Sequence, residues 1–258
     1  MKRAYSKILL SVMVIVLLTG CGKSQAVKDV EEAIGAIGEV SVDKRDAIKN
    51  AEKLYNILSD GEKADVSNRA TLVDAQEAFK KIQEEQAFED AKIVYGKLND
   101  AADRCINGMT DIYGAWYFGI YKADEKQSIA KCFTNMAKET PHFSYEELLS
   151  LAFSGAISGS FDWQFCVNVI ILGYTTNGEY EGIDTELKEA SDILNTMTSI
   201  YDDSTYYPKL KDYYNAVKTY FDFFKSPSGS FSQLTDSINS YEKTIKASKQ
   251  EAGFLIEK

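Results

Sequence analysis

The chain holds a single histidine, His142, which stands between Pro141 and Phe143. One histidine is too few for a multi-histidine or histidine–cysteine zinc site, and it leaves no ordinary pair of nucleophile and base. The sequence also lacks the spacings of a nucleophile elbow, a phosphate-binding loop, a dinucleotide-binding turn and an EF-hand. We therefore expect no catalytic residue, no metal and no cofactor, with His142 in a partly exposed loop.

Carboxylates are abundant, and some stand next to each other, such as Glu146 with Glu147 and Asp202 with Asp203. Neighbours on a helix point about 100° apart, so such a pair does not act on one substrate. Carboxylates from distant segments can still converge, as they do in glycosidases. A hydrolase acting on glycans is therefore kept as an alternative to a non-catalytic protein.

Tyrosines form the sharpest pattern of side chains that could bind a ligand. Tyr206, Tyr213 and Tyr220 are spaced seven apart, which places them on one helix face. Rings with hydroxyl tips on such a face can stack on sugars or anchor a protein partner. The alternative is that they belong to the core, because aromatic stripes at helical spacing are usually buried. We name the three tyrosines a candidate binding face and keep both interpretations.

Cys105, Cys132 and Cys166 lie far apart along the chain. Three cysteines at wide spacing do not form a disulfide framework, and at most one bridge can join them. Cysteine is among the most buried residue types, so the sequence favours three buried thiols. Their pairing is not fixed by the sequence.

The fourth cysteine, Cys21, ends a distinctive N-terminal segment. A basic start with Lys2, Arg3 and Lys7 precedes the apolar run Ile8–Leu18, which is too short for a permanent membrane span. The sequence LTGC at positions 18–21 then resembles the lipobox of bacterial lipoprotein precursors. That resemblance implies a signal peptide at 1–20, a diacylglyceryl group on the Cys21 sulfur and a fatty acid such as palmitate. Two acyl chains hold a protein stably on a membrane, so the expected location is the extracytoplasmic face of the cell membrane.

The charge of the chain limits its partners. Residues 1–20 hold three of the 29 basic residues and no acidic one, so the remaining 238 residues carry 26 basic and 39 acidic side chains, a net charge of −13. Such a chain repels the phosphate backbone of nucleic acids and anionic lipid heads. We expect no nucleic acid partner, and membrane contact only through the lipid at Cys21, with residues 21–26 as a polar tether.

Residues 27–86 are predicted to form a small module of three helices. Asp43 is placed to cap the second, and Thr71 with Asp74 to open the third. Part of this region resembles a helical module of Gram-positive surface and secreted proteins. The matching positions are Ile34, Ile37, Gly38, Val40, Val42, Asp43, Ala47, Ile48, Ala51, Tyr55, Leu58, Ser59, Asp60, Glu62, Lys63, Val66, Asn68, Leu72, Ala75 and Phe79. The resemblance implies a spacer or interaction element and carries no site residues.

Residues 87–258 are predicted to form a larger antiparallel helical bundle, joined to the module by a helix that nothing interrupts. Residues 183–197, 210–224 and 231–245 each carry an apolar heptad stripe, and short loops join them. Residues 163–174 are apolar nearly all round, which fits either a buried helix or a buried strand. A longer stripe precedes them, at Tyr95, Leu98, Ala102, Cys105, Met109, Ile112 and Trp116. The fold class is therefore all-α.

Together these patterns predict a lipid-anchored protein of the bacterial cell envelope, with a non-catalytic role in binding a protein or glycan partner. The glycan hydrolase is one alternative. The other is a solute-binding lipoprotein of a transporter, whose usual two α/β lobes require alternating strands that the sequence does not indicate.

Overall fold

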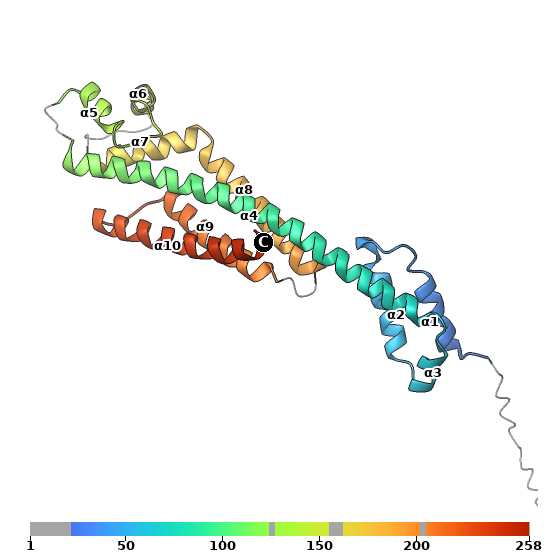
Figure 1. The fold of residues 1–258 in the computed structure, drawn as a ribbon. Coiled ribbons are helices and arrows are strands. Elements are labelled where there is room, and N and C mark those ends of the chain that lie inside the picture. The colour runs from blue at the N-terminus through green and yellow to red at the C-terminus, as the bar shows by residue number, and fades with distance from the viewer. Residues whose placement is uncertain (1–21, 124–126, 155–161, 202–204, 258) are drawn as a thin grey trace, which may run out of the picture. The chain divides into compact units, whose positions relative to one another are not determined.

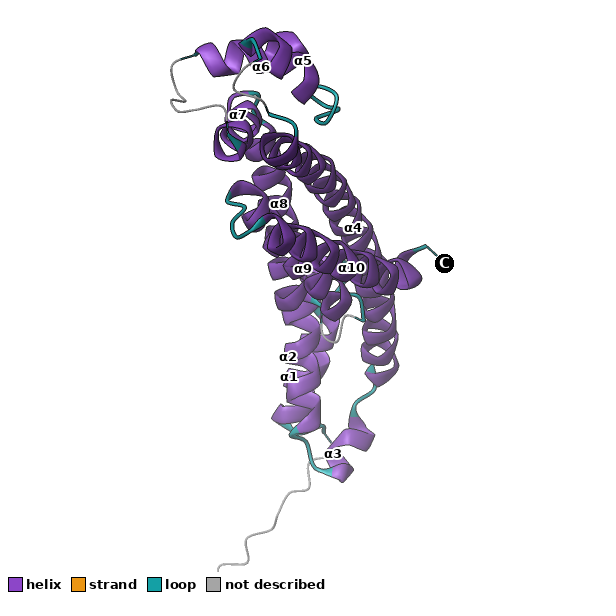
Figure 2. Cartoon of the chain, turned by 90° about the vertical axis from the view of Figure 1, so that its left-hand side faces the viewer, coloured by secondary structure: helices purple, strands orange, loops and turns teal. Residues whose placement is uncertain are grey.

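The computed structural model describes residues 22–123, 127–154, 162–201 and 205–257. These residues contain no strand (Figure 2). The all-α prediction is therefore confirmed, and residues 163–174 lie in a helix. The described residues also lack the α/β lobes of a solute-binding lipoprotein. The elements are α1 Gln25–Gly35, the 3₁₀ turn η1 Val42–Lys44, α2 Arg45–Asn56, α3 Asp60–Asp65, α4 Arg69–Tyr121, α5 Ile129–Met136, α6 Tyr145–Phe153, α7 Trp163–Thr176, α8 Glu179–Ile200, α9 Tyr207–Lys225 and α10 Phe231–Ile256.

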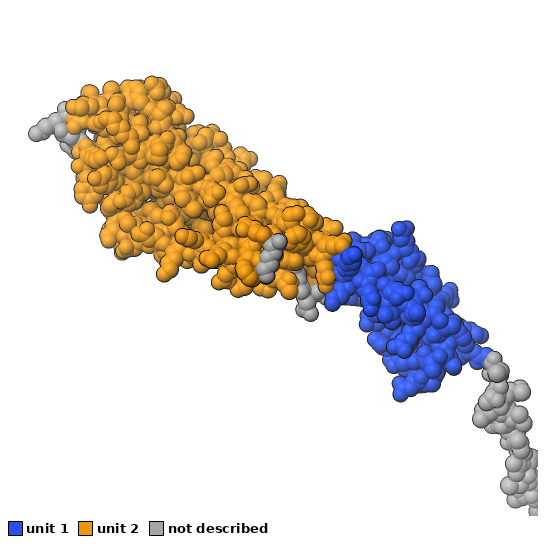
Figure 3. Space-filling view, viewed as in Figure 1, with its two compact units in different colours: residues 1–82 blue, residues 83–258 orange. Residues whose placement is uncertain are grey.

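The chain divides into two compact units between Ile82 and Gln83 (Figure 3). This point falls inside α4, about one turn before the expected domain boundary at residue 86. The long helix passes through it without interruption. The prediction of a helical connection is thus confirmed, and the sequence explains it, since residues 82–90 contain several strong helix formers and no proline or glycine.

The first unit differs in detail from the three predicted helices. The Ser59 hydroxyl and the Glu62 carboxylate form a capping box that begins an additional helix, α3. Asp43 lies in the turn η1 instead of capping α2, and α4 begins at Arg69, before the expected cap at Thr71. One apolar cluster holds the unit together, and its members are Val27, Val30, Ile34, Ile37, Ile48, Ala51, Leu58, Val66, Leu72, Ala75 and Phe79.

The second unit is a bundle in which the chain runs up, down, up and down (Figure 1). Contacts along α4 establish the directions. Arg104 pairs with Glu179, whereas Gln83 bonds to Ile200, so α8 runs antiparallel to α4. α9 follows the direction of α4, and α10 returns, since Phe231 at its start meets Tyr113 and Glu257 just after its end meets Tyr95.

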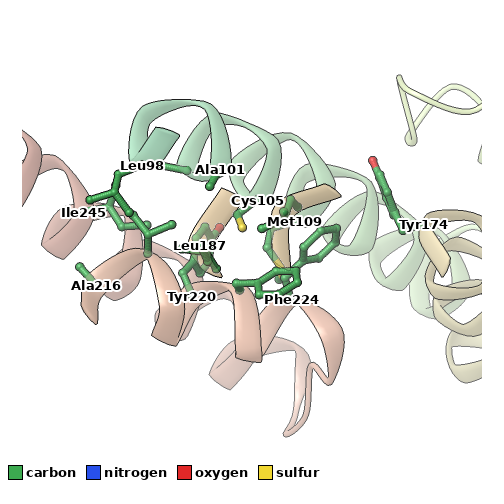
Figure 4. Close-up of a cluster of buried hydrophobic side chains, with 14 of the residues drawn as sticks. Leu98, Ala101, Cys105, Met109, Tyr174, Leu187, Ala216, Tyr220, Phe224 and Ile245 are labelled. Atoms are coloured by element: carbon green, nitrogen blue, oxygen red, sulfur yellow. The ribbon is translucent and has the colours of Figure 1, made fainter. Parts of the chain in front are cut away.

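The core of the bundle is built from the predicted heptad stripes. All seven predicted stripe residues of α4, from Tyr95 to Trp116, are buried. Figure 4 shows Cys105 and Met109 of α4 facing Tyr220 and Phe224 of α9. The approach is close, because a Cβ atom added at Gly108 would lie 2.0 Å from the Phe224 ring. Leu187 from α8 and Ile245 from α10 complete this cluster.

Two short helices, α5 and α6, begin with serine caps. The Ser128 hydroxyl accepts a hydrogen bond at the start of α5, and Ser144 with Glu147 forms a capping box at the start of α6. The segment between them packs against two helices of the bundle. A Cβ atom at Gly114 on α4 would lie 1.7 Å from the Glu139 carbonyl oxygen, and one at Gly173 on α7 would lie 2.4 Å from the Phe143 ring.

A search of the described helices for a membrane span, judged by length and apolar character, found none.

Candidate functional site

The surface of the bundle carries a group of four aromatic rings, two exposed and two half-buried, which we call the aromatic ladder: Tyr113, Tyr117 and Tyr121 of α4 and Phe231 of α10. The Tyr113 and Tyr117 rings are nearly parallel, at 5°, with centroids 6.5 Å apart, and Tyr121 follows at 5.2 Å. Phe231 lies 5.1 Å from Tyr113 and 5.8 Å from Tyr121. Tyr113 is 38% exposed and Tyr121 is 62% exposed. The ladder is therefore a continuous aromatic surface in contact with water.

The position of the ladder follows from the helical repeat. Tyr113 and Tyr117 come directly after Ile112 and Trp116, which are buried stripe residues. Adjacent residues on a helix point about 100° apart, so the tyrosines emerge at the edge of the buried face. Their spacing of four keeps them on one side of the helix, where each ring meets the next. Phe231 reaches them because it begins α10, which packs antiparallel to α4.

A groove continues from Tyr113 between α4 and α10. It has a volume of about 250 Å³, and we call it the α4–α10 groove. Its walls combine apolar and polar side chains, namely Met109, Thr110, Tyr113, Thr235, Ile238, Asn239 and Glu242. Apolar walls with a few fixed polar groups are typical of ligand sites.

Glu242 connects the groove to the core. The buried hydroxyl of Tyr220 donates a hydrogen bond to Glu242 Oε1 at 3.1 Å. Burial, and then the charge of Glu242, raises the pKa of Tyr220 well above its usual range, so the phenol keeps its proton. The second oxygen of Glu242 accepts no hydrogen bond from the described residues. One carboxylate oxygen is thus held in place and the other is open to a ligand.

The other polar groups of the groove also have a defined polarity. Thr110 donates its hydroxyl hydrogen to the Ile106 carbonyl at 3.0 Å, and Thr235 donates to the Phe231 carbonyl at 2.9 Å. Both hydroxyl oxygens therefore present lone pairs to the groove. Within the described part of the chain, the Asn239 amide makes no side-chain hydrogen bond. The groove consequently offers mainly acceptors, with one amide that can both donate and accept.

A cation lies beside the ladder. The Lys122 ammonium sits 5.1 Å from the centroid of the Tyr117 ring and pairs with Glu139. Its hydrogen bond to Glu139 raises the pKa of Lys122, which therefore stays charged. One face of Tyr117 is thus already occupied by a positive charge.

The single histidine belongs to a second polar cluster, at the contact of α4 with α7. Asp111 is fully buried, and its carboxylate accepts hydrogen bonds from the His142 backbone at 3.2 Å and from the Tyr174 hydroxyl, with His142 Nδ1 at 2.9 Å. Burial, followed by the bond to Asp111, raises the pKa of Tyr174 beyond its usual range. The His142 side chain is 44% exposed, in agreement with the predicted loop position. Neighbouring Phe143 and Gly173 line a separate groove that does not include His142. The hydrogen bonds to Asp111 hold the loop before α6 against α4 and α7.

The prediction that Tyr206, Tyr213 and Tyr220 form an exposed binding face is wrong for Tyr213 and Tyr220 of α9. Tyr213 and Tyr220 have no exposed area, and the Tyr213 hydroxyl is satisfied by Asn99 Oδ1 at 2.8 Å. Tyr206 is half-buried and packs against Phe88 at 5.9 Å. The reason is that α9 packs between α8 and α10 and also meets α4, which buries a wider face than one heptad stripe. The alternative prediction, that these rings belong to the core, is confirmed for Tyr213 and Tyr220.

The three cysteines of the bundle are buried, and none of them takes part in a disulfide within the described residues. Burial raises the pKa of the Cys166 thiol to about 12 and that of Cys105 further still. Because the thiolate is the reactive form, these side chains behave as small apolar residues. The prediction of buried thiols is confirmed. Cys21, the expected lipid attachment site, lies outside the described residues.

Carboxylates do not converge in the grooves that the structure shows. The α4–α10 groove contains Glu242, the groove beside Phe143 contains Glu147, and a third, near Lys209, contains Glu251. Glu147 is engaged in its capping box, and Lys209 pairs with Glu251. None of these three grooves holds the two facing carboxylates of a glycosidase. Among the described residues, no group of three or more His, Cys, Asp or Glu side chains is arranged to hold a metal ion. Asp202 and Asp203 lie outside the described residues.

The fold and its surface define the class of protein: an all-α helical bundle that presents an aromatic ladder and an adjoining groove. Comparisons with protein-family models, with curated proteins and with solved structures found no match to the chain.

Proposed function

We propose that this chain is a lipid-anchored interaction protein of the bacterial cell envelope, held on the extracytoplasmic face of the membrane by acyl chains on Cys21. The support is the order of the N-terminal parts: a basic start, an apolar run of signal-peptide length, and LTGC at 18–21. The acidic balance of the rest of the chain fits attachment through lipid instead of through a basic surface.

The aromatic ladder is the observation that carries the binding role. Aromatic residues at a bundle surface are normally covered, because burying a ring is worth several kcal/mol, on the order of 25 cal/mol per Å². Here Tyr113 and Tyr121 are open to water, and their hydroxyls make no hydrogen bond within the described residues. Exposed rings beside a groove with fixed polar groups are typical of an interaction site. The partner of this site is a protein or a glycan of the envelope.

The anchor is tested by growing the producing bacterium with a clickable palmitate analogue. We expect the full chain to be labelled and to sediment with membranes, while Cys21→Ala is not labelled, because it lacks the thiol at position 21 and its remaining cysteines are buried. Label that persists in the Cys21→Ala variant would contradict the proposed attachment site.

The binding role is tested with isolated cell envelopes and the chain from Gly22 to Lys258, which contains both compact units. We expect Tyr113→Ser/Tyr121→Ser to lower retention on envelopes by about tenfold or more, since two aromatic contacts are lost. Matched controls are Ile57→Ser and Phe153→Ser, which change exposed apolar side chains elsewhere, at 74% and 68% exposure. Equal retention of the ladder variant and the controls would show that the ladder is not the binding site.

A further inference from the structure

The polarity of the α4–α10 groove restricts what its ligand can be. Glu242 and the two threonine hydroxyls present acceptors, and the hydrogens of both hydroxyls are already donated to backbone carbonyls. A ligand that fits must therefore bring several hydrogen-bond donors of its own. Asn239 and the phenol of Tyr113, which both donate and accept, can satisfy acceptors on the same ligand.

The charges around the site disfavour an anion in the groove and a cation on the Tyr117 ring. Glu242 stands in the groove and repels an anion, while the Lys122 ammonium over the Tyr117 ring repels a cation approaching that ring. Lys122 keeps its positive charge, because donating a hydrogen bond to the Glu139 carboxylate raises the pKa of its ammonium group. The surface therefore favours a ligand with no net charge.

The rings require apolar surface on the ligand as well. Tyr113 and Tyr121, two helical turns apart, are the ladder rings open to water, so they offer aromatic surface at two positions to a ligand with repeated flat units. Phe231 closes the ladder on the side of α10. A sugar ring has one face lined with C–H bonds and an edge of hydroxyl groups, which are both donors and acceptors.

We infer that the aromatic ladder and the α4–α10 groove bind a neutral glycan, with sugar rings stacked on the exposed rings Tyr113 and Tyr121 and their hydroxyls donating to Glu242, Thr110 and Thr235. This inference rests on the proposed binding function and specifies its ligand class. A proline-rich peptide also docks on aromatic ladders, but it offers mostly carbonyl acceptors because proline has no N–H. It would leave the acceptors of this groove without donors, and buried acceptors without partners weaken binding.

The experiment separates the two classes of ligand on the same material. Envelope fragments coupled to beads are treated with a broad protease, or with anhydrous trifluoromethanesulfonic acid, which breaks glycosidic bonds and leaves peptide bonds intact. The chain from Gly22 to Lys258 and its Tyr113→Ser/Tyr121→Ser variant are then applied. We expect the unmodified chain to bind untreated and protease-treated beads alike and to lose about tenfold or more on acid-treated beads.

Two other outcomes have distinct meanings. Binding that is lost after protease and kept after acid treatment, and that still depends on the tyrosines, overturns the glycan inference while the proposed binding function stands. Binding to untreated beads that is the same for the unmodified chain and the tyrosine variant overturns the proposed function and the inference together.

Salt and the groove side chains test the neutral character of the ligand. Raising the ionic strength from about 0.1 M to about 1 M shortens the screening length from about 10 Å to about 3 Å, and we expect binding to change less than about twofold. A fall of about tenfold would identify a charged polymer and overturn the inference.

Asn239→Ala, on an exposed position, is expected to weaken binding about tenfold with an unchanged urea midpoint, whereas Asp236→Ala, also exposed on α10, leaves binding unaltered. Equal binding of these two variants would contradict the assignment of Asn239.

Discussion

Two pairs of tyrosines at helical spacing have opposite environments. Tyr213 and Tyr220 on α9 are fully buried, whereas Tyr113 and Tyr121 on α4 are open to water. The difference lies in what surrounds each helix. α9 packs between α8 and α10 and also meets α4, so even residues beside its main stripe are enclosed. Among the described residues, the last turns of α4 meet α7 and the segment between α5 and α6, while on the side of Tyr113 they meet the first turn of α10.

The two spacings also behave differently on a helix. Residues seven apart differ by about 20° and stay with the stripe, whereas each step of four advances by about 40°. From Tyr113 to Tyr121 the side chains therefore rotate by about 80° away from the buried face. Tyrosine spacing, taken with the number of neighbouring helices, separates core rings from surface rings.

The largest expected effect comes from removing a buried ring. Tyr213→Ala should lower the free energy of unfolding by about 3–5 kcal/mol, because it leaves a cavity and leaves the side-chain oxygen Oδ1 of Asn99 without its donor. Tyr121→Ala should change it by no more than about 0.5 kcal/mol. Urea denaturation of both variants measures the contrast, and similar losses would break the distinction between the two sets.

A smaller effect is expected at Gly114, which follows exposed Tyr113 but faces the segment between α5 and α6. Gly114→Ala should destabilise by about 1–3 kcal/mol, because its Cβ would lie 1.7 Å from the Glu139 carbonyl oxygen. Gly96→Ala, in the same helix with open space around it, should stabilise by up to about 1 kcal/mol. The urea midpoints should move in opposite directions. Equal shifts would mean that α4 is not packed on this side.

The Tyr220 hydroxyl alone should matter less. Tyr220→Phe keeps the ring in the core but removes the donor to Glu242, which should cost about 1 kcal/mol. Tyr121→Phe removes a hydroxyl that has no partner among the described residues and should cost almost nothing. Unfolding free energies from denaturation curves test the pair. An unaffected Tyr220→Phe would show that the Glu242 carboxylate does not depend on this bond.

A further effect depends on pH. Burial raises the pKa of Tyr213 and Tyr220 above the ordinary value of 10.0, so both phenols stay neutral in the folded chain. A raised pKa contributes stability below pH 10 that is lost as the pH rises above it, because the unfolded chain then releases protons that the folded chain retains. The fall in stability from pH 9 to about 11 should be shallower in Tyr213→Phe/Tyr220→Phe, and an identical slope would contradict the buried phenols.

Much of the fold follows from local sequence signals. The serine caps at Ser128, Ser144 and Ser230 and the stripe on α4 locate helix starts and a buried face without knowledge of the neighbours. The role of Ser59 is ambiguous from the three residues Ser-Asp-Gly alone, because they end one helix as readily as they begin another. The decisive signal was Glu62 at the third helical position, which completes the capping box.

The aromatic ladder and the α4–α10 groove could not be predicted from local sequence, because both depend on how α4 and α10 pack. Tyr113 and Tyr117 stand one residue after buried stripe positions, a signal that places them at an edge but does not tell whether another helix covers them. Phe231 was predicted to belong to the core stripe of α10, and it is only half-buried because it lies at the first turn. The groove depends on the register of α10 against α4, which no local pattern encodes.

The hydrogen bond between Tyr220 and Glu242 links ligand binding in the α4–α10 groove to the thermal stability of the bundle. A ligand that binds only the folded chain raises the free energy of unfolding, by about 2.7 kcal/mol when its concentration is 100 times the dissociation constant. Since Glu242 belongs both to the groove and to the contact of α9 with α10, heat-induced melting of those helices registers a ligand in the groove. A rise in melting temperature, abolished by Tyr113→Ser/Tyr121→Ser, is therefore a label-free way to rank candidate glycans.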